Sequence, residues 1–359
     1  MDETLQMLKD LTEAPGVPGQ EQPVRDVMAR YLSPLGEVIT DNLGSVVAYR
    51  TGNGVDRDRA PKVLMAGHLD EVGFLVTLID DDGFLKFQSL GGWWEQVMLA
   101  QRVIVRTRKG DLTGVFGSKP PHILSAEDKK KMVEKSDMFI DIGVLSRDEA
   151  VEAGVRPGDP VIPVCPFTPL ANPKMLLAKA WDNRFGCALA VQALKDLGGD
   201  HPNTVYAGAT VQEEVGLRGA ATLANLVKPD VALSLDVGIA GDTPGIKKHE
   251  AQGKLGKGPA ILIFDGSLIP NLKLRNLFVD VAEEEGIPYQ FDTVAMGGTD
   301  GGRFQLAYEG VPSINIGIPA RYIHSATSIV NLDDFLNAAK LVAGVIRRLD
   351  ADTVADLKR

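Results

Sequence analysis

From about Pro166 to the end of the chain, short apolar runs typical of buried strands alternate with longer runs that have helical spacing. The strand candidates are MLLAKAW, TVYAGATV, VALSLDVG, PAILIF and PSINIGI. The helix candidates are RFGCALAVQALKDL, GLRGAATLANLV, NLKLRNLFVDVAEEEG, GGRFQLAYEG and a final LDDFLNAAKLVAGVIRRL. Strands that alternate with helices predict a sheet with both faces covered. We therefore expect an α/β fold in which helices flank a mixed sheet.

A different pattern precedes this region. Residues 1–71 contain two helix candidates, a hairpin and the buried strand candidate VLMAG, which is followed by GHLDEVG. From Val72 to about Val164 come short β-type runs divided by turn residues, as in VGFLVTLI, FLKFQSL and QRVIVRTRKGDLTGVFG. A chain of 359 residues is also long for a single core. We predict one α/β domain from residues 1–71 and 165–359, interrupted by a small β-rich domain at 72–164.

Side chains that can bind a metal end or follow five of the predicted strands. Ligand sites in α/β sheets collect at the carboxyl ends of strands, so we expect these side chains to lie close together. A lone Asp at a strand end is more often a helix N-cap, but five such strand ends are difficult to attribute to chance. The residues are His68, Asp70 and Glu71 in GHLDEVG, Asp182 in WDNRFG, Glu213 and Glu214 in QEEVG, Asp236 in LDVG, and His324 in RYIHS.

The mixture of ligand types narrows the choice of metal. Two imidazoles with several carboxylates suit Zn²⁺, Co²⁺ or Mn²⁺, whereas a set of oxygens alone would indicate Mg²⁺ or Ca²⁺. A carboxylate can bridge two metals, and the sequence has no HExxH motif for a single zinc on a helix. Taken singly, His68 is more often a core histidine, and the Glu213–Glu214 pair could be an exposed turn.

Composition excludes several classes of protein. The formal net charge of −10 argues against nucleic-acid binding, which favours a clustered basic surface. The N-terminal MDETLQMLKDLTEAPG is acidic, unlike a signal peptide, and no apolar run approaches the ~20 residues of a membrane helix. Cys165 and Cys187 lack CxxC spacing, and Cys187 in GCALAVQAL is interpreted as a buried thiol. We expect no membrane partner and a cytoplasmic location.

The motifs GHLDEVG, WDNRFG, VQEEVGLRGA, LDVG, GGTDGG and RYIHS together resemble a known family. They are similar to the cytoplasmic di-metal aminopeptidases that assemble into hollow tetrahedral dodecamers. That family includes glutamyl and deblocking aminopeptidases, and some members are labelled endoglucanase. The similarity covers essentially the whole chain. It implies a zinc-exopeptidase-like fold, peptide substrates, and two divalent metal ions per subunit, Zn²⁺ or Co²⁺. It also implies a homo-oligomer, in which the 72–164 domain forms dimers that assemble into a dodecamer.

The resemblance further implies a role for each site residue, and an Asp182–Asn183 peptide bond that is often cis in the family. The implied reaction is hydrolysis of the N-terminal peptide bond by a water held between the metals. Such a water still needs a base that is not itself a metal ligand. By position, Asp182 matches the bridging carboxylate, Glu214 and His324 the other ligands of one metal, His68 and Asp236 those of the second, Glu213 the general base, and Asp70 the carboxylate that orients His68.

Several alternatives remain open at the level of the sequence. Ile239, Ile269 and Ile318 could favour a neutral or aliphatic N-terminal residue, which is the preference we expect, whereas Lys247, Lys248 or Arg321 could favour glutamate. A metal-dependent deacylase acting on non-peptide amides would use similar ligands. A metal-independent glycosidase needs only two carboxylates and leaves both histidines without a role. A degenerate hydrolase that only binds peptides would not need to retain Glu213 and the five ligands.

Overall fold

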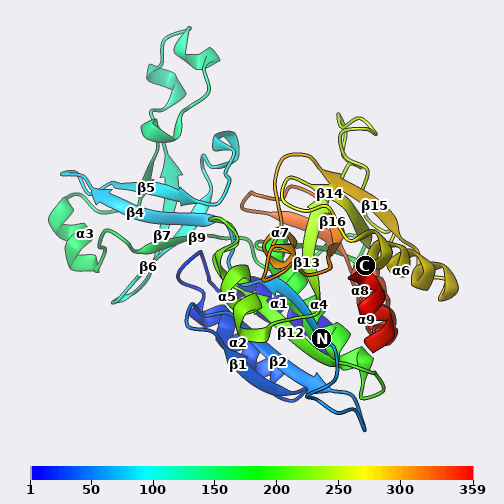
Figure 1. Ribbon diagram of the computed structural model, residues 1–359. Helices are drawn as coiled ribbons and strands as arrows, with labels where there is room; N and C mark the ends of the chain where they lie inside the picture. The colour runs from blue at the N-terminus through cyan, green and yellow to red at the C-terminus, as the bar shows by residue number, and fades with distance from the viewer. Residues whose placement is uncertain (1, 359) are drawn as a thin grey trace.

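The computed structural model describes residues 2–358, and a mixed sheet of eight strands lies at its centre (Figure 1). The strand order is β1-β2-β12-β3-β13-β16-β14-β15. Strands β12, β3, β13 and β16 run parallel, while β2 and β14 are antiparallel to their neighbours β12 and β16. The predicted α/β fold is confirmed. The strands are β1 (Glu37–Thr40), β2 (Val46–Thr51), β3 (Lys62–His68), β12 (Thr204–Thr210), β13 (Val231–Ile239), β14 (Ala260–Asp265), β15 (Gln290–Val294) and β16 (Ser313–Ala320).

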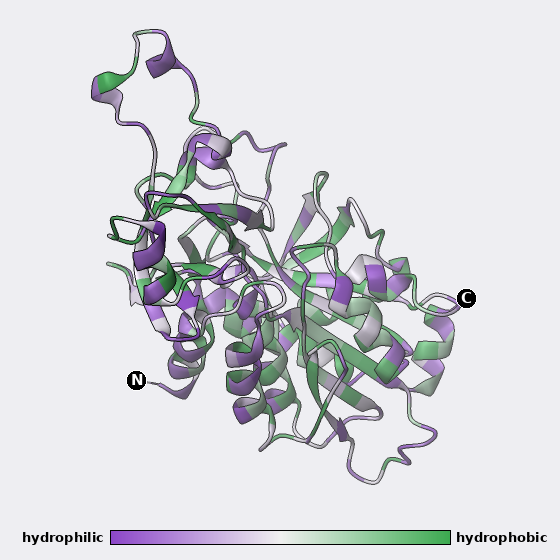
Figure 2. Ribbon diagram, turned by 90° about the vertical axis from the view of Figure 1, so that its left-hand side faces the viewer, coloured by the Kyte–Doolittle hydropathy of each residue, from purple (hydrophilic) through white to green (hydrophobic). Residues whose placement is uncertain are grey.

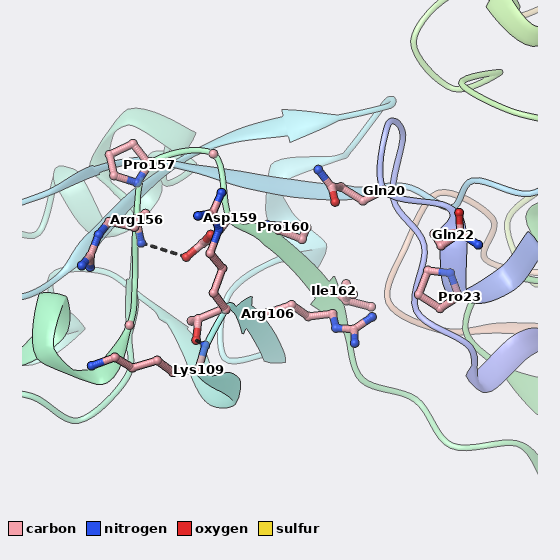
Figure 3. A pocket seen from close by; sticks show the side chains of 14 residues that line it. Gln20, Gln22, Pro23, Arg106, Lys109, Arg156, Pro157, Asp159, Pro160 and Ile162 are labelled. Carbon is pink, nitrogen blue, oxygen red and sulfur yellow. Dashed lines mark hydrogen bonds between the residues drawn. The ribbon is translucent and has the colours of Figure 1, made fainter. Parts of the chain in front are cut away.

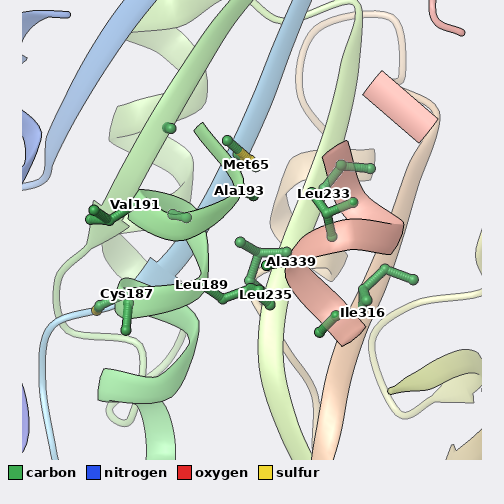
Figure 4. Packing of buried hydrophobic residues seen from close by; sticks show 14 of the residues in the cluster. Met65, Cys187, Leu189, Val191, Ala193, Leu233, Leu235, Ile316 and Ala339 are labelled. Atoms are coloured by element: carbon green, nitrogen blue, oxygen red, sulfur yellow. The ribbon is translucent and has the colours of Figure 1, made fainter. Parts of the chain in front are cut away.

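Helices cover both faces of this sheet because the buried strands carry apolar side chains on both sides. Along β13, Leu233, Leu235 and Val237 belong to the large core cluster, while Ala232 faces a smaller cluster on the opposite side. Figure 4 shows Leu189 of the central helix α4 beside Leu235 and Ala339 of helix α8. The helices are α1 (Glu3–Glu13), α2 (Gln22–Leu32), α4 (Trp181–Leu197), α5 (Arg218–Val227), α6 (Leu272–Glu284), α7 (Gly301–Gln305), α8 (Leu332–Ile346) and α9 (Ala351–Leu357).

A closed barrel of six short strands stands to one side of the sheet (Figure 1). It has its own core, in which the rings of Phe74, Phe87 and Phe116 meet edge to face with centroids 4.8 to 5.3 Å apart. Its first and last strands pair with each other, Phe74 opposite Val161. The β-rich insertion is therefore present as part of the predicted fold. The elements are β4 (Gly73–Ile79), β5 (Leu85–Leu90), β6 (Arg102–Thr107), β7 (Gly110–Gly117), β8 (Phe139–Asp141), α3 (Arg147–Ala153) and β9 (Pro160–Pro163).

The segment between β7 and β8 projects away from the barrel as a long arm, mostly hydrophilic in Figure 2. Short 3-10 turns interrupt it, and the DKKKMVEK stretch within it is largely exposed. The hydrophobic colouring of Figure 2 is concentrated instead on the strands of the large sheet. Within residues 2–358, no helix combines the length and the apolar character needed to span a bilayer.

One strand was assigned to the wrong sheet. The run MLLAKAW was expected in the large sheet, but β11 (Met175–Ala178) pairs with β10 (Thr168–Pro169) and β17 (Ser328–Asn331) in a separate three-stranded sheet. The strand β17 has only four residues, and its partner lies about half the chain away, so no local pattern reveals the pairing. The short edge strand β15 and the terminal helix α9 were also not predicted.

Candidate metal centre

Asp182 lies at the centre of a cluster formed at the carboxyl edge of the large sheet. Its Oδ1 is 3.2 Å from Nε2 of His68, and its Oδ2 is 3.4 Å from Nε2 of His324. His68 is the last residue of β3, and His324 follows β16, so the parallel strands bring the two rings to one edge. Asp182 lies at the start of α4, where its backbone angles are not helical, and the Asp182–Asn183 peptide bond that follows it is cis. One carboxylate thus presents one oxygen to each histidine.

Two groups of side chains around Asp182 have the spacing of metal ligands. His68, Asp182 and Asp236 can each offer one atom within 4.8 Å of the others, and so can Asp182, Glu214 and His324. Asp182 belongs to both groups. All five residues identified in the sequence as ligands therefore meet at one place, although only His68 and Asp236 lie on strands of the large sheet.

Both histidines are held in the same way. Nδ1 of His68 is 3.0 Å from the backbone oxygen of Asp70, and Nδ1 of His324 is 2.7 Å from the backbone oxygen of Gly92. A carbonyl oxygen can only accept, so each Nδ1 carries the proton and each Nε2 is directed toward Asp182. Gly92 follows the barrel strand β5, so the inserted barrel supplies part of the site.

The adjacent glutamates turn toward the cluster in different directions. Glu214 Oε2 is 3.8 Å from His324 Nε2, whereas Glu213 Oε2 is 3.7 Å from His68 Nε2 and belongs to neither ligand group. The backbone allows this because Gln212 has a φ of 55° and the N–H of Gly216 donates to the oxygen of Glu213 at 2.9 Å. The chain thus bends on both sides of the pair, with a left-handed turn at Gln212 before it and a hydrogen-bonded turn ending at Gly216 after it.

Asp70 holds this turn. Its Oδ1 accepts the backbone N–H of Glu213 and its Oδ2 accepts that of Glu214, both at 3.0 Å. The same carboxylate lies 3.6 Å from His68 Nδ1, farther than the backbone oxygen of Asp70 itself. Asp70 is thus placed to position the two glutamates as well as the histidine.

Negative charge is in excess at this centre. Burial, together with Asp182, raises the pKa of Glu214 to about 8, and burial raises the pKa of Glu213 and Asp236 well above the usual range. Although burial opposes it, hydrogen bonds to Asp182 and the charge of Glu214 raise the pKa of His324 to about 10. The Oε1 atom of Glu214 is buried and has no hydrogen-bond partner among residues 2–358. Crowded carboxylates with an unpartnered oxygen and two imidazoles fit divalent cations.

Glu71 is the one metal-competent side chain of GHLDEVG that the structure directs elsewhere. Its Oε1 is 2.6 Å from Lys179 Nζ and 3.2 Å from Arg184 Nη2, with all three side chains buried. Arg184 also donates to the backbone oxygens of Leu11, Ala14, Gly16 and Leu69. This buried network ties the N-terminal segment to the residues that flank His68 and Asp182.

With this geometry known, comparison with other proteins identifies the family. A family model described as M42 glutamyl aminopeptidase matches residues 44–341. The chain belongs to the M42 aminopeptidase family. The resemblance seen in the sequence motifs is confirmed, and an M42 aminopeptidase acts on the N-termini of peptides. The two ligand groups at Asp182 agree with the metal dependence of M42 peptidases.

Individual relatives cover nearly the full length of this M42 protein. Glutamyl aminopeptidase of Lactococcus lactis subsp. cremoris is 37% identical over 360 residues, 99% of either chain. The structure of a TET aminopeptidase from a marine sediment Thaumarchaeota archaeon matches with a TM-score of 0.96 and 49% identity over 99% of both chains. Pyrococcus horikoshii TET1 peptidase, which can assemble into a tetrahedron or a large octahedral shell, matches with a TM-score of 0.84 and 34% identity, covering 97% of this chain and 100% of that one.

The cluster of this M42 aminopeptidase opens into a cavity of about 510 Å³. Of the wall residues named in the sequence, Ile239 lines it, whereas Ile318 is fully buried and Ile269 lies outside the lining. Most of the other walls were missed in the sequence, although the glycine-rich MGGTDGG was a visible signal. The missed residues are Gly92, Gly216, Leu217, Val237, Val294, Met296, Gly297, Gly298, Thr299 and Ile323.

A larger cavity of about 940 Å³ lies elsewhere, between the barrel and the loop that precedes α2 (Figure 3). It is lined by Arg106, Arg108, Lys109 and Arg156, and the N–H of Arg156 donates to Asp159 at 2.8 Å. Its lining contains no His, Cys or Glu, so it lacks a set of metal ligands. The smaller cavity is therefore the candidate active site despite its size.

Proposed function

We propose that this M42 aminopeptidase removes single N-terminal residues from peptides with the help of two divalent metal ions. Asp182 would be shared between them, with His68 and Asp236 completing one site and Glu214 and His324 the other. The observation that carries this proposal is the placement of one Asp182 oxygen near each histidine. Zn²⁺ and Co²⁺ both suit this mixture of ligands. Such ions, when bound, lower the pKa of a water and polarise a carbonyl group.

Glu213 is the proposed general base. It lies beside the ligand groups without belonging to them, so its carboxylate is free to accept a proton from the attacking water. Once protonated, Glu213 can return the proton to the departing amine. Asp70 would support this step by fixing the backbone of Glu213.

The cavity supports a preference for neutral and aliphatic N-terminal residues. Leu217, Ile239, Met296 and Ile323 give it apolar walls. A preference for glutamate has less support, because Arg321 lies outside the cavity lining and its Nε and Nη2 already donate to Asp242 at 2.8 Å. Lys247 and Lys248 are exposed and lie outside the cavity lining.

The assembly is proposed to be a homo-oligomer, with residues 72–164 forming dimers that build a dodecamer. Its support is the overall likeness to the Pyrococcus horikoshii TET1 peptidase, which assembles into closed shells. Light scattering after size-exclusion chromatography would measure the number of subunits, and a monomer would contradict this part of the proposal.

The reaction is tested with metal-loaded protein on two substrate panels, aminoacyl anilides and N-acyl amino acids. We expect hydrolysis of the anilides only, with loss of activity in a chelator and recovery on adding Zn²⁺ or Co²⁺. Hydrolysis of the N-acyl amino acids instead would identify a deacylase. Activity on glycosides that persists in the chelator would identify a glycosidase.

A further inference from the structure

A buried glutamate from the N-terminal region reaches the turn at residues 212–216, which carries the two adjacent glutamates of the site. Glu21 lies directly before helix α2 and is only 6% exposed. Its Oε1 accepts the backbone N–H of Gln212 at 3.2 Å, across 191 positions of the chain. Gln212 directly precedes the proposed base Glu213. Glu21 therefore contacts this turn without belonging to either group of metal-ligand candidates.

Three successive backbone N–H groups of this turn all donate to buried carboxylates. The N–H of Gln212 donates to Glu21. The N–H groups of Glu213 and Glu214 donate to the two oxygens of Asp70. The two carboxylates come from different segments, the loop before α2 and the loop after β3. Glu21 thus holds the residue before Glu213, while Asp70 holds Glu213 and the residue after it.

Gln212 needs such support because of its backbone conformation. Its φ of 55° lies in the left-handed region, which is unfavourable for a residue with a Cβ atom and persists only where surrounding contacts impose it. Two backbone contacts do so here. The N–H of Gln212 donates to Glu21, and its carbonyl oxygen accepts the N–H of Arg218 at 3.2 Å. Loss of Glu21 would remove one of the two, so Gln212 could relax and shift the residue that follows it.

Holding its own loop does not fully account for Glu21. The same Oε1 accepts the N–H of Gly19 at 2.7 Å, a local bond that a neutral amide side chain could also make. Within residues 2–358, Glu21 has no cationic partner at ion-pair distance. Burial, and then the charge of Asp70, raise the pKa of Glu21 to about 7. A carboxyl group is costly to bury in this way, and the bond to Gln212 gives the position a further role.

Asp80 in the barrel shows what a carboxylate that holds only its own loop looks like. Its Oδ1 accepts the N–H groups of Asp82 and Phe84, both within four residues of it in the turn between β4 and β5. Glu21 uses one oxygen in the same manner, but divides it between its own loop and the turn at residues 212–216. This difference makes Asp80 a suitable control.

We propose that Glu21 is a positioning residue that acts through Gln212 to hold the backbone of the general base Glu213. By fixing the N–H of Gln212, it keeps the carboxylate of Glu213 beside His68. Glu21 does not line the cavity at the metal cluster, so it does not meet the substrate itself. This inference rests on the proposed aminopeptidase function and adds a residue that supports its base.

The test measures kcat, KM and metal content on a leucyl anilide in Glu21→Ala, Glu21→Gln and the control Asp80→Ala. In Glu21→Ala, kcat is expected to fall about 10- to 100-fold, as for a small displacement of a catalytic group, with KM within about twofold. The metal content should not change. Glu21→Gln keeps an oxygen that can accept both N–H groups and should keep kcat close to that of wild type. Asp80→Ala removes a comparable acceptor from the barrel and should change neither kcat nor metal content.

A double variant shows whether Glu21 acts through the base. Glu213→Gln already lacks the base, so adding Glu21→Ala should lower its residual kcat by less than about twofold. A loss as large as in the wild-type background would assign Glu21 to folding or to another part of the site and would overturn the proposal. So would an unchanged kcat in Glu21→Ala alone, or a loss of metal in that variant.

Hydrogen exchange tests the positioning role without relying on activity. If the metal-loaded wild type hydrolyses no aminoacyl substrate, the proposed function fails, but the role of Glu21 in the turn can still be measured. The amides of Glu213 and Glu214 do not donate to Glu21, yet they should exchange faster in Glu21→Ala than in wild type or Asp80→Ala. Equal exchange in all three proteins would reject the positioning role.

Discussion

The carboxylate of Asp70 accepts the backbone N–H of Glu213 at 3.0 Å. Its second oxygen accepts the N–H of Glu214 at the same distance, so one side chain fixes the two residues whose proposed roles differ. In Asp70→Asn, one oxygen is replaced by an NH₂ group that faces a donor. We expect kcat and metal affinity to fall about 10- to 100-fold while the protein stays folded. Steady-state kinetics with metal analysis and circular dichroism measure this; full activity in the variant would contradict the positioning role.

The two glutamates should separate in a paired substitution. Glu213→Gln removes the proposed base but no ligand, so turnover is expected to drop by about 10²- to 10⁴-fold with metal content unchanged. Glu214→Gln removes a ligand and should lower the metal content itself. Both variants keep the size of the side chain, so each serves as the control for the other. Equal metal loss in the two variants would contradict the different roles proposed for Glu213 and Glu214.

Removing the metal should change how stability depends on pH. In the metal-free fold, Glu214 has a pKa of about 8 and His324 of about 10, both above their ordinary values. The folded state then binds more protons than the unfolded state, so the free energy of unfolding falls as pH rises, from about pH 4.5 to 8 for Glu214 and above about 6.5 for His324. We expect the Tm of chelator-treated protein to drop between pH 5.5 and 8 more than that of metal-loaded protein. If the Tm of the chelator-treated protein and that of the metal-loaded protein depend on pH in the same way, cations do not bind at this site.

The two cysteines should differ in reactivity. Cys187 is fully buried, donates to the backbone oxygen of His68 at 3.0 Å, and has a pKa raised by burial to about 12. Its thiol stays protonated at pH 8, and the thiolate is the reactive form. Cys165 is partly exposed. Ellman's reagent should therefore titrate one thiol in the native protein and both after denaturation, and Cys165→Ser should leave none titratable before unfolding.

The buried network at Glu71 should dominate stability over exposed ion pairs. Glu71→Ala leaves Lys179 and Arg184 buried without their carboxylate, and breaking such a pair costs about 3–5 kcal/mol. Glu3→Ala removes the exposed pair with Lys195 and should cost less than about 1 kcal/mol. Urea denaturation of both variants measures the difference. Similar midpoints would show that the network contributes little.

The sequence could predict those parts of the site that depend on local pattern. His68 and Asp236 follow from parallel strands, because such strands bring their carboxyl ends to one edge. Asp182 and His324 were found as metal-competent residues, but the sheet of β11 was wrong because its partner β17 is short and distant.

Other features depend on contacts between distant segments. The hydrogen bonds from the backbone of Glu213 and Glu214 to Asp70 join residues about 140 positions apart, and no hydrophobic periodicity in the sequence predicts them. His201 lies between α4 and β12 but is buried against Asn203, a contact that its GDHP sequence does not predict.

The pairing of Phe74 with Val161 has a consequence for how the chain is threaded. The first and last strands of the barrel lie side by side, so the polypeptide enters and leaves the barrel at neighbouring points and the barrel is a closed excursion from the path of the chain. The long arm between β7 and β8 extends this excursion and projects away from the strands that carry His68 and Asp236 (Figure 1). The barrel nevertheless meets the candidate metal centre at its Gly92 turn, whose backbone oxygen accepts a hydrogen bond from His324, so a change in that turn would reach the site.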